Sequence, residues 1–313
     1  MSWAAHELES YVLQKHIKTK VSFLAILLGC FWPDMISKGT VYGFDAFGFS
    51  FHPKNPDLYH RGWPGVGFTH SLMYGVVISL IVLWVFKSRA WALGLLIGHW
   101  AHVFTDICDS VGVMLFFPFS TQNYSIGMWA YAAQQGRYGD ASAYYSSLGG
   151  VWDLFWLGMV LLSWKVLTRN YFFTKVVADD PVWPWFKRRL KMSEVLMLAL
   201  YRAYFLYGAC RIFAWFFWSR FVDKAPLDLS WGGPYWVEKV HAKYPPIGEL
   251  LLRSTLGAAG LAASMWVLWM VVGRRLWGRA EKHEKARALA NAKRASQVPR
   301  QKSGRDMAGA KGQ

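Results

Sequence analysis

Cysteine is scarce in this chain of 313 residues, and the signatures of common soluble enzymes are missing from it. The three cysteines, Cys30, Cys108 and Cys210, are odd in number and widely spaced in apolar surroundings. This argues against a disulfide framework or a thiolate metal motif, so we expect three small core residues. No Gly-x-Ser-x-Gly elbow, Walker loop or dinucleotide fingerprint stands out, so serine-based catalysis and nucleotide binding have no support.

Acidic residues are also few: the chain has 19 Asp and Glu but 35 Lys and Arg, which gives a net charge of +16. More than half of the excess lies in residues 274–313, where twelve basic and three acidic residues give +9 (12 − 3). A basic stretch directly after an apolar segment is typical of the cytoplasmic side of a membrane protein. We therefore interpret the charge as a topology signal and expect no specific nucleic-acid partner.

Hydrophobic residues make up 54% of the chain and aromatic residues 18%, and the apolar residues occur in long blocks. This pattern is typical of an integral membrane protein. We predict an all-α, polytopic membrane protein with about six membrane-entering helices, the first of them short, and a basic C-terminal tail. The expected segments are residues 21–33, 65–86, 90–117, 151–166, 194–219 and 247–272. An amphipathic helix is expected at residues 3–15, and loops at residues 35–64 and 118–149.

Basic residues gather at residues 15–20, 87–89 and 165–192 and in the tail. With six segments all four places fall on one face, so the positive-inside rule predicts that both termini are cytoplasmic. The same topology brings a set of ionisable residues to the outer half of the membrane. These residues are Asp34, His60, His70, His99, His102, Asp106 and Asp153.

Residues 98–119 contain the densest group of these side chains. His99, His102, Asp106 and Asp109 share one face of the expected helix. Imidazoles and carboxylates in a membrane segment need partners, and one divalent metal ion would satisfy all four. Mixed imidazole and carboxylate ligands favour Zn²⁺, with Mn²⁺ or Fe²⁺ as alternatives. The other interpretation is a hydrogen-bonded His–Asp pair that joins two helices.

Four short motifs occur in one order along residues 1–120. They are Trp-Pro-Asp ending at Asp34, His-Arg-Gly at 60–62, Phe-Thr-His-Ser at 68–71, and Ala-His-Val-Phe-Thr-Asp at 101–106 before Gly-Val-Met-Leu-Phe-Phe-Pro-Phe. This combination resembles the bacterial inner-membrane metal-dependent hydrolase family, also described as LexA-binding, inner-membrane-associated hydrolases. The resemblance implies a metal-dependent hydrolase, distantly similar to the helical zinc phospholipase C and P1 nuclease fold.

The resemblance and the side-chain chemistry together give one candidate site. Its metal ligands would be His6, Asp34, His60, His70, His102 and Asp106. Asp106 or Asp34 would accept a proton from water, and Arg61 would contact a phosphate or carboxylate oxygen. His6 reaches this site only if the chain folds back around residues 15–20, which would place the N-terminus outside.

The roles of Asp153 and His99 remain open. Asp153 is either a buried ligand or a favourable charge at a helix N-terminus, and His99 is a candidate to support a ligand. Separately, the chain departs from the family's pattern in two places. The family's second acid is missing after Asp34, which weakens a two-metal site, and residues 63–67 separate His-Arg-Gly from the next motif.

These observations favour an integral membrane hydrolase of an ester or phosphoester, with membrane lipids as partners and an amphiphilic or phosphorylated substrate. A non-catalytic scaffold with a structural His/Asp cluster is the alternative, and a metal or proton transporter is the third. We divide the chain into a hydrolase-like domain (1–170), additional transmembrane helices (171–278) and a basic, disordered tail (279–313). The sequence identifies no protein partner.

Overall fold

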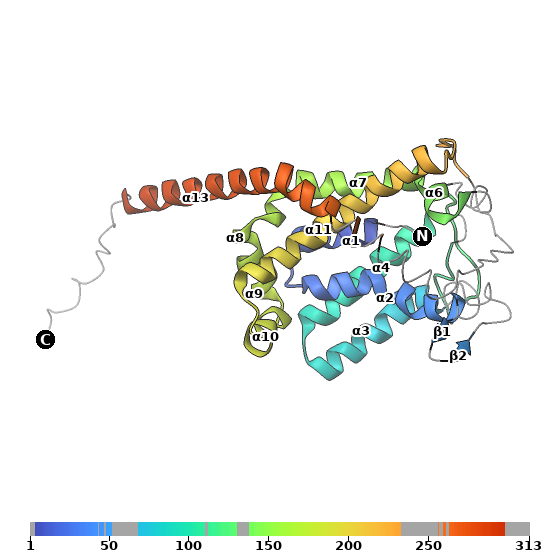
Figure 1. The fold of residues 1–313 in the computed structure, drawn as a ribbon. Helices are drawn as coiled ribbons and strands as arrows, with labels where there is room; N and C mark the ends of the chain where they lie inside the picture. The colour runs from blue at the N-terminus through green and yellow to red at the C-terminus, as the bar shows by residue number, and fades with distance from the viewer. Residues whose placement is uncertain are drawn as a thin grey trace, which may run out of the picture.

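The computed structural model describes residues 4–42, 44–46, 48–51, 68–109, 112–129, 138–232, 256, 259–260 and 263–297. These residues form a mainly α-helical structure with one short antiparallel hairpin of β1 (Phe44–Ala46) and β2 (Phe49–Phe51), which confirms the predicted all-α class (Figure 1). The longer helices are α1 (Ala5–His16), α2 (Phe23–Tyr42), α3 (Leu72–Phe86), α4 (Arg89–Ile107), α7 (Leu148–Leu162), α11 (Glu194–Phe217) and α13 (Arg274–Gln297). The short elements named below are η3 (Phe68–His70), α6 (Asp140–Tyr145), α8 (Arg169–Tyr171), α9 (Val177–Asp179), α10 (Val182–Arg189), η6 (Trp218–Val222) and η7 (Trp269–Gly273).

Among the described residues, one continuous helix is long and apolar enough to cross a membrane. It comprises α11 and η6 and runs from Glu194 to Val222. The apolar helices Phe23–Ile36, Leu72–Phe86 and Leu148–Leu162 are shorter. The number of six membrane-entering segments therefore stays a prediction.

Helix α1 lies inside the bundle and packs against α2, α7 and α11. The chain reverses after His16, so α1 and α2 form a helical hairpin. The helix predicted at residues 3–15 is confirmed as α1, but all of residues 5–12 are buried, so the expectation that it is amphipathic is wrong. Glu7 and Glu9 are buried in α1 with its apolar residues. Arg211 of α11 donates to Glu7, and the Tyr11 hydroxyl donates to the Tyr201 carbonyl at 2.6 Å. These partners satisfy polar groups that would otherwise be costly to bury.

Helices α2 and α4 approach each other closely because glycines line their interface. A Cβ atom at Gly98 would lie 2.0 Å from the Ile26 carbonyl oxygen, and one at Gly29 would lie 2.4 Å from the Leu95 carbonyl oxygen. Gly94, one turn before Gly98, is similarly close to the Ser22 carbonyl. Small residues at this spacing let the backbones of two membrane helices touch. The contact therefore brings the side chains that α4 presents to α2 close to the α2 backbone.

Three predicted boundaries are wrong. Helix α2 continues through Pro33 to Tyr42, so the loop expected from residue 35 begins later. One proline removes a single backbone donor, and apolar surroundings favour continued internal hydrogen bonding. Helix α4 ends at Ile107 rather than 117, and α6 forms within the loop expected at 118–149.

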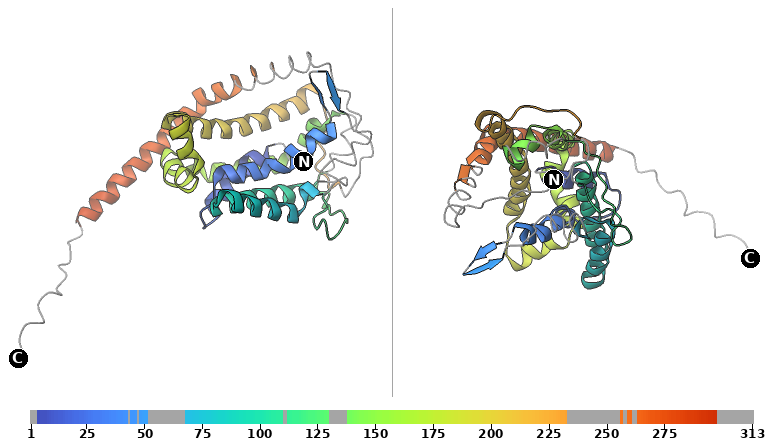
Figure 2. Two further views of the ribbon diagram at one scale, coloured as in Figure 1. Left: turned by 90° about the horizontal axis from the view of Figure 1, so that it is seen from below. Right: turned by 90° about the vertical axis from the view of Figure 1, so that its right-hand side faces the viewer.

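The hydrophobic core combines α1, α7, α11 and the beginning of α13. Tyr11, Phe23 and Tyr201 pack with ring centroids about 5 Å apart, and Phe205 contacts Trp277 of α13. The boundary proposed at residue 171 stays a prediction. Helix α13 continues into the basic tail as far as Gln297 and extends beyond the bundle (Figures 1 and 2). The sequence predicts a frayed helix leading to disorder after residue 279.

Candidate metal centre

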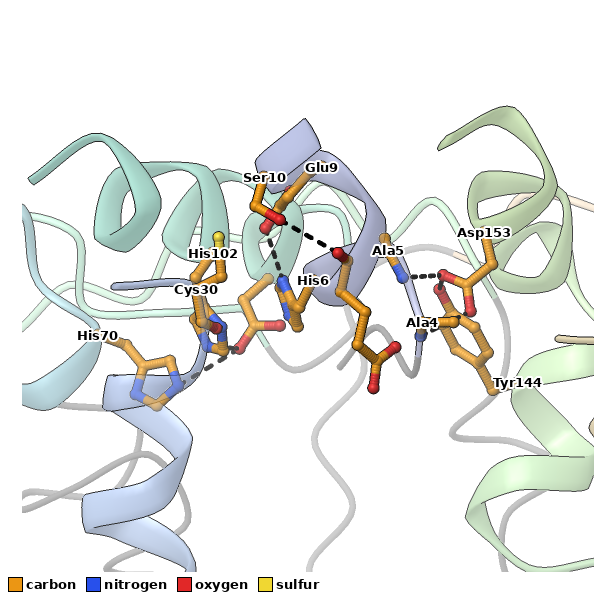
Figure 3. Close-up of polar contacts among 12 residues, drawn as sticks. Ala4, Ala5, His6, Glu9, Ser10, Cys30, His70, His102, Tyr144 and Asp153 are labelled. Carbon is orange, nitrogen blue, oxygen red and sulfur yellow. Dashed lines mark hydrogen bonds and ion pairs between the residues drawn. The ribbon is translucent and has the colours of Figure 1, made fainter. Parts of the chain in front are cut away.

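Five ionisable side chains from four elements meet inside the bundle. His6 comes from α1, Asp34 from α2, His70 from η3, and His102 and Asp106 from α4. The three histidines and Asp106 are each at most 3% exposed. Asp34 differs, since its side chain is 22% exposed. Figure 3 shows His6, His70 and His102 facing a common region between the helices.

The distances between the side chains fit a shared ion better than direct hydrogen bonds. The Nε2 atom of His70 lies 3.5 Å from Asp34 Oδ1 and 3.5 Å from Asp106 Oδ2. His102 Nε2 is also 3.5 Å from Asp106 Oδ2. A tetrahedral ion with bonds of about 2.1 Å separates its ligand atoms by about 3.4 Å. Two groups, His6–His102–Asp106 and Asp34–His70–His102, each have their ligand atoms within 4.8 Å of one another.

Hydrogen bonds on the far side of two imidazole rings orient them toward this centre. His102 Nδ1 lies 2.6 Å from the Cys30 carbonyl oxygen, which can only accept, so Nδ1 carries the hydrogen and Nε2 carries the lone pair. His6 Nδ1 lies 3.0 Å from a carboxylate oxygen of Glu9. Within the described residues, the Nε2 atoms of His6 and His102 have no hydrogen-bond partner. Metal-binding histidines typically have this arrangement.

The three imidazole rings also lie close together, those of His6 and His102 stacked and that of His70 tilted against His102. The centroids of His6 and His102 are 4.1 Å apart with nearly parallel planes, and those of His70 and His102 are 5.0 Å apart. His70 Nδ1 lies 2.9 Å from the Thr69 hydroxyl, so this ring also directs Nε2 to the centre. Neutral imidazoles bind divalent cations, so closely spaced rings suit a shared ion.

Asp153, an open candidate from the sequence, has a different role. Its two carboxylate oxygens accept the backbone hydrogens of Ala4 and Ala5, each at 3.0 Å (Figure 3). They also accept the hydroxyl hydrogens of Tyr144 and Tyr145 at 3.1 and 2.8 Å. The carboxylate thus stabilises a helix N-terminus, as one interpretation suggested, but that of α1 rather than its own helix. It anchors the end of α1 that carries His6.

The remaining predicted residues lie apart from this centre or outside the described residues. His99 Nε2 donates to the Ser71 carbonyl at 2.9 Å, so it fixes the turn before α3 rather than supporting a ligand. Asp109 lies after the end of α4 and no longer shares a helix face with His102. His60 and Arg61 fall outside the described residues. Sequence reasoning missed Glu9, although its i+3 spacing from His6 was a usable signal.

Comparison with known proteins gives one match. A family model described as YdjM inner membrane protein matches residues 9–222, which is more than half of the chain. This confirms the resemblance found from the four motifs and extends it beyond residue 120. His6 precedes the matched range, whereas Asp34, His70, His102 and Asp106 lie within it. Neither the curated proteins nor the solved structures give a match.

Proposed function

We propose that this chain, which belongs to the YdjM inner membrane protein family, is a metal-dependent hydrolase of an ester or phosphoester. The observation that carries the proposal is the convergence of three orientated imidazoles and two carboxylates in two overlapping groups of possible ligands that share His102. A merely structural His–Asp pair needs only two partners, and the arrangement here leaves the Nε2 atom of His6 without a hydrogen bond in the described residues. Such an atom is costly to bury unless a ligand completes it.

We assign the ion to His6, His70, His102 and Asp106, which are the most buried members of the set. Their donor atoms are imidazole nitrogens and a carboxylate oxygen, which suit Zn²⁺ first and Mn²⁺ or Fe²⁺ as alternatives. A divalent ion at this position supplies Lewis-acid polarisation of the substrate and acidifies water.

Asp34 is the residue we assign to proton transfer. Its side chain is partly exposed, whereas that of Asp106 is 1% exposed, so Asp34 is the carboxylate that water and substrate can reach. Its oxygen lies 3.5 Å from His70 Nε2, which holds it beside the centre. In this role Asp34 Oδ takes the proton that water loses during attack. Arg61, outside the described residues, keeps its assignment to a phosphate or carboxylate oxygen.

The substrate class follows from the setting of the centre. It lies among helices of an inner membrane protein, near the end of the bundle that carries the start of α1 and the Asp153 anchor. An amphiphilic or lipid-linked ester would reach such a position directly from the bilayer, while its apolar part stays in the bilayer. The polar group of the substrate would then meet Asp34, the partly exposed member of the set.

The proposal is tested with the full chain in lipid nanodiscs, loaded with Zn²⁺ or Mn²⁺. Chromogenic phosphomonoesters, phosphodiesters and carboxylic esters, together with phospholipids, form the panel. Wild type should hydrolyse one class, and Asp34→Asn should lower that rate by about 10²-fold or more while the metal content is retained. His16→Ala, a change of an exposed histidine at the other end of α1, is the control. A metal-loaded wild type that hydrolyses no member of the panel would favour the scaffold interpretation.

A further inference from the structure

A cavity lies between α7, α11, η7 and α13, and its lining shares no residue with the metal centre. Its volume is about 660 Å³, within the range of about 300–1,000 Å³ that holds small molecules. Its walls are apolar and include Leu157, Leu161, Leu206, Phe213, Leu268 and Leu276. One wall is part of α11, the helix that is long and apolar enough to cross a membrane.

The shape of the cavity is fixed because specific contacts hold α13 against α11. Arg202 of α11 donates to Glu281 of α13 at 2.6 Å and to the Leu167 carbonyl at 3.0 Å. The guanidinium of Arg202 also lies 5.0 Å from the ring centre of Trp277, and Phe205 packs on the same ring. These contacts hold the beginning of α13 over the apolar walls.

The end of the cavity at α13 is cationic. Arg279 and His283 both line it, and their spacing of four residues places them on one face of α13. Both side chains are exposed. A smaller, separate cavity of about 370 Å³ on the same helix is lined by Arg169, Lys285 and the acidic Glu281. The apolar cavity itself is thus lined by one permanent positive charge, that of Arg279, and by one histidine.

We propose that this cavity binds an anionic phospholipid, with one acyl chain between α7 and α11 and its phosphate beside Arg279. The apolar walls match an acyl chain, and the cationic end matches the charge of the headgroup. The cavity is also lined by Trp164 and Leu167, which directly precede α8, and Figure 1 shows α8, α9 and α10 together at one end of the bundle. The basic residues 187–191 lie at the end of α10. By the positive-inside rule this end faces the cytoplasmic leaflet, the anionic one. The site is independent of any hydrolysis at the metal centre.

The test uses the full chain in detergent, with phosphatidylglycerol and phosphatidylcholine of identical acyl chains as probes. Native mass spectrometry counts bound lipid, and the thermal midpoint is recorded against lipid concentration. Wild type should bind one phosphatidylglycerol in preference to phosphatidylcholine and be stabilised by it. Arg279→Gln should weaken this binding about fivefold, the effect of one cationic contact at an anionic headgroup. Leu276→Trp, which places a large ring in the cavity from an exposed position, should block it.

Arg275→Gln is the matched control, because it removes the same charge from an exposed position of α13 that does not line the cavity. It should leave phosphatidylglycerol binding unchanged. Equal weakening by Arg275→Gln and Arg279→Gln would overturn the proposal in favour of diffuse surface attraction. Equal binding of the two lipids would overturn the headgroup assignment. Absence of bound lipid from wild type would overturn the site itself.

Discussion

His102 donates the hydrogen of Nδ1 to the backbone carbonyl of Cys30 at 2.6 Å, and the opposite nitrogen of the same ring lies 3.5 Å from Asp106. One interhelical hydrogen bond therefore fixes both the tautomer and the direction of a candidate ligand. The bond depends on the close contact of α2 and α4, which the glycines of the interface permit. The packing of two helices and the geometry of the metal centre are thus coupled.

The first prediction follows from that coupling. In Gly98→Ala, the new Cβ would lie 2.0 Å from the Ile26 carbonyl oxygen, so α2 and α4 must separate. We expect a loss of about 1–3 kcal/mol in the free energy of unfolding, with weaker metal binding because the His102–Cys30 bond stretches. Thermal unfolding and metal titration in detergent measure both effects. Gly158→Ala in α7 is the control, since in the described part of the chain no neighbouring element has an atom within 4 Å of its Cβ position. Equal behaviour of the two variants would contradict the coupling.

The second prediction concerns the carboxylate behind His6. Glu9→Gln keeps the size of the side chain but removes the negative charge that lies 3.0 Å from His6 Nδ1. We expect metal affinity to fall by about 10–100-fold, as is typical when a supporting partner of a metal-binding histidine is changed. Competition with a chromophoric chelator measures the affinity. Glu194→Gln, which changes a carboxylate exposed at the start of α11, should have no effect. Unchanged affinity in Glu9→Gln would remove His6 from the ligand set.

The third prediction concerns the anchor of α1. Asp153→Asn weakens the acceptor of the Ala4 and Ala5 backbone hydrogens, so the protein should lose about 1–3 kcal/mol of stability. Metal affinity should fall as well, because His6 moves with the end of α1. In a His6→Ala background, Asp153→Asn should cause no additional loss of affinity, since both changes act through one ligand. Additive losses would show that Asp153 acts on the centre by another route.

The fourth prediction is a revised topology. The α1–α2 hairpin places the start of α1 at the opposite end of α1 from the basic residues 15–20. We expect the N-terminus to lie on the periplasmic side and the C-terminus to remain cytoplasmic. This departs from the sequence-based expectation that both termini are cytoplasmic. Alkaline phosphatase fused before residue 1 should be active, and the same enzyme fused after residue 313 should be inactive. Activity of the C-terminal fusion alone would reverse the orientation.

The part of the site on α4 was predictable from the sequence. His102 and Asp106 are four residues apart in one helix, so local periodicity alone places both side chains on one face. The Thr69–His70–Ser71 turn was also expected at the start of the next helix, and Ser71 caps α3 there. These features depend on interactions between near neighbours in the chain.

The contribution of α1 was not predictable in the same way. His6 joins the centre through a reversal of the chain and through a carboxylate 147 residues away from it in sequence, at Asp153. The prediction of where α2 ends was wrong for a related reason. Pro33 and the polar residues after it predict a loop unless the surroundings favour a helix. Packing between residues far apart in the sequence therefore determines both the position of His6 and the end of α2.

The central claim is that this centre holds a metal ion, and elemental mass spectrometry of the purified chain tests it most directly. Wild type and His102→Ala are purified in detergent, dialysed and measured alongside His16→Ala. The account predicts about one Zn, Mn or Fe per chain in wild type and His16→Ala, and its loss in His102→Ala. No metal in correctly folded wild type, even after incubation with each ion, or equal metal in His102→Ala, would contradict it.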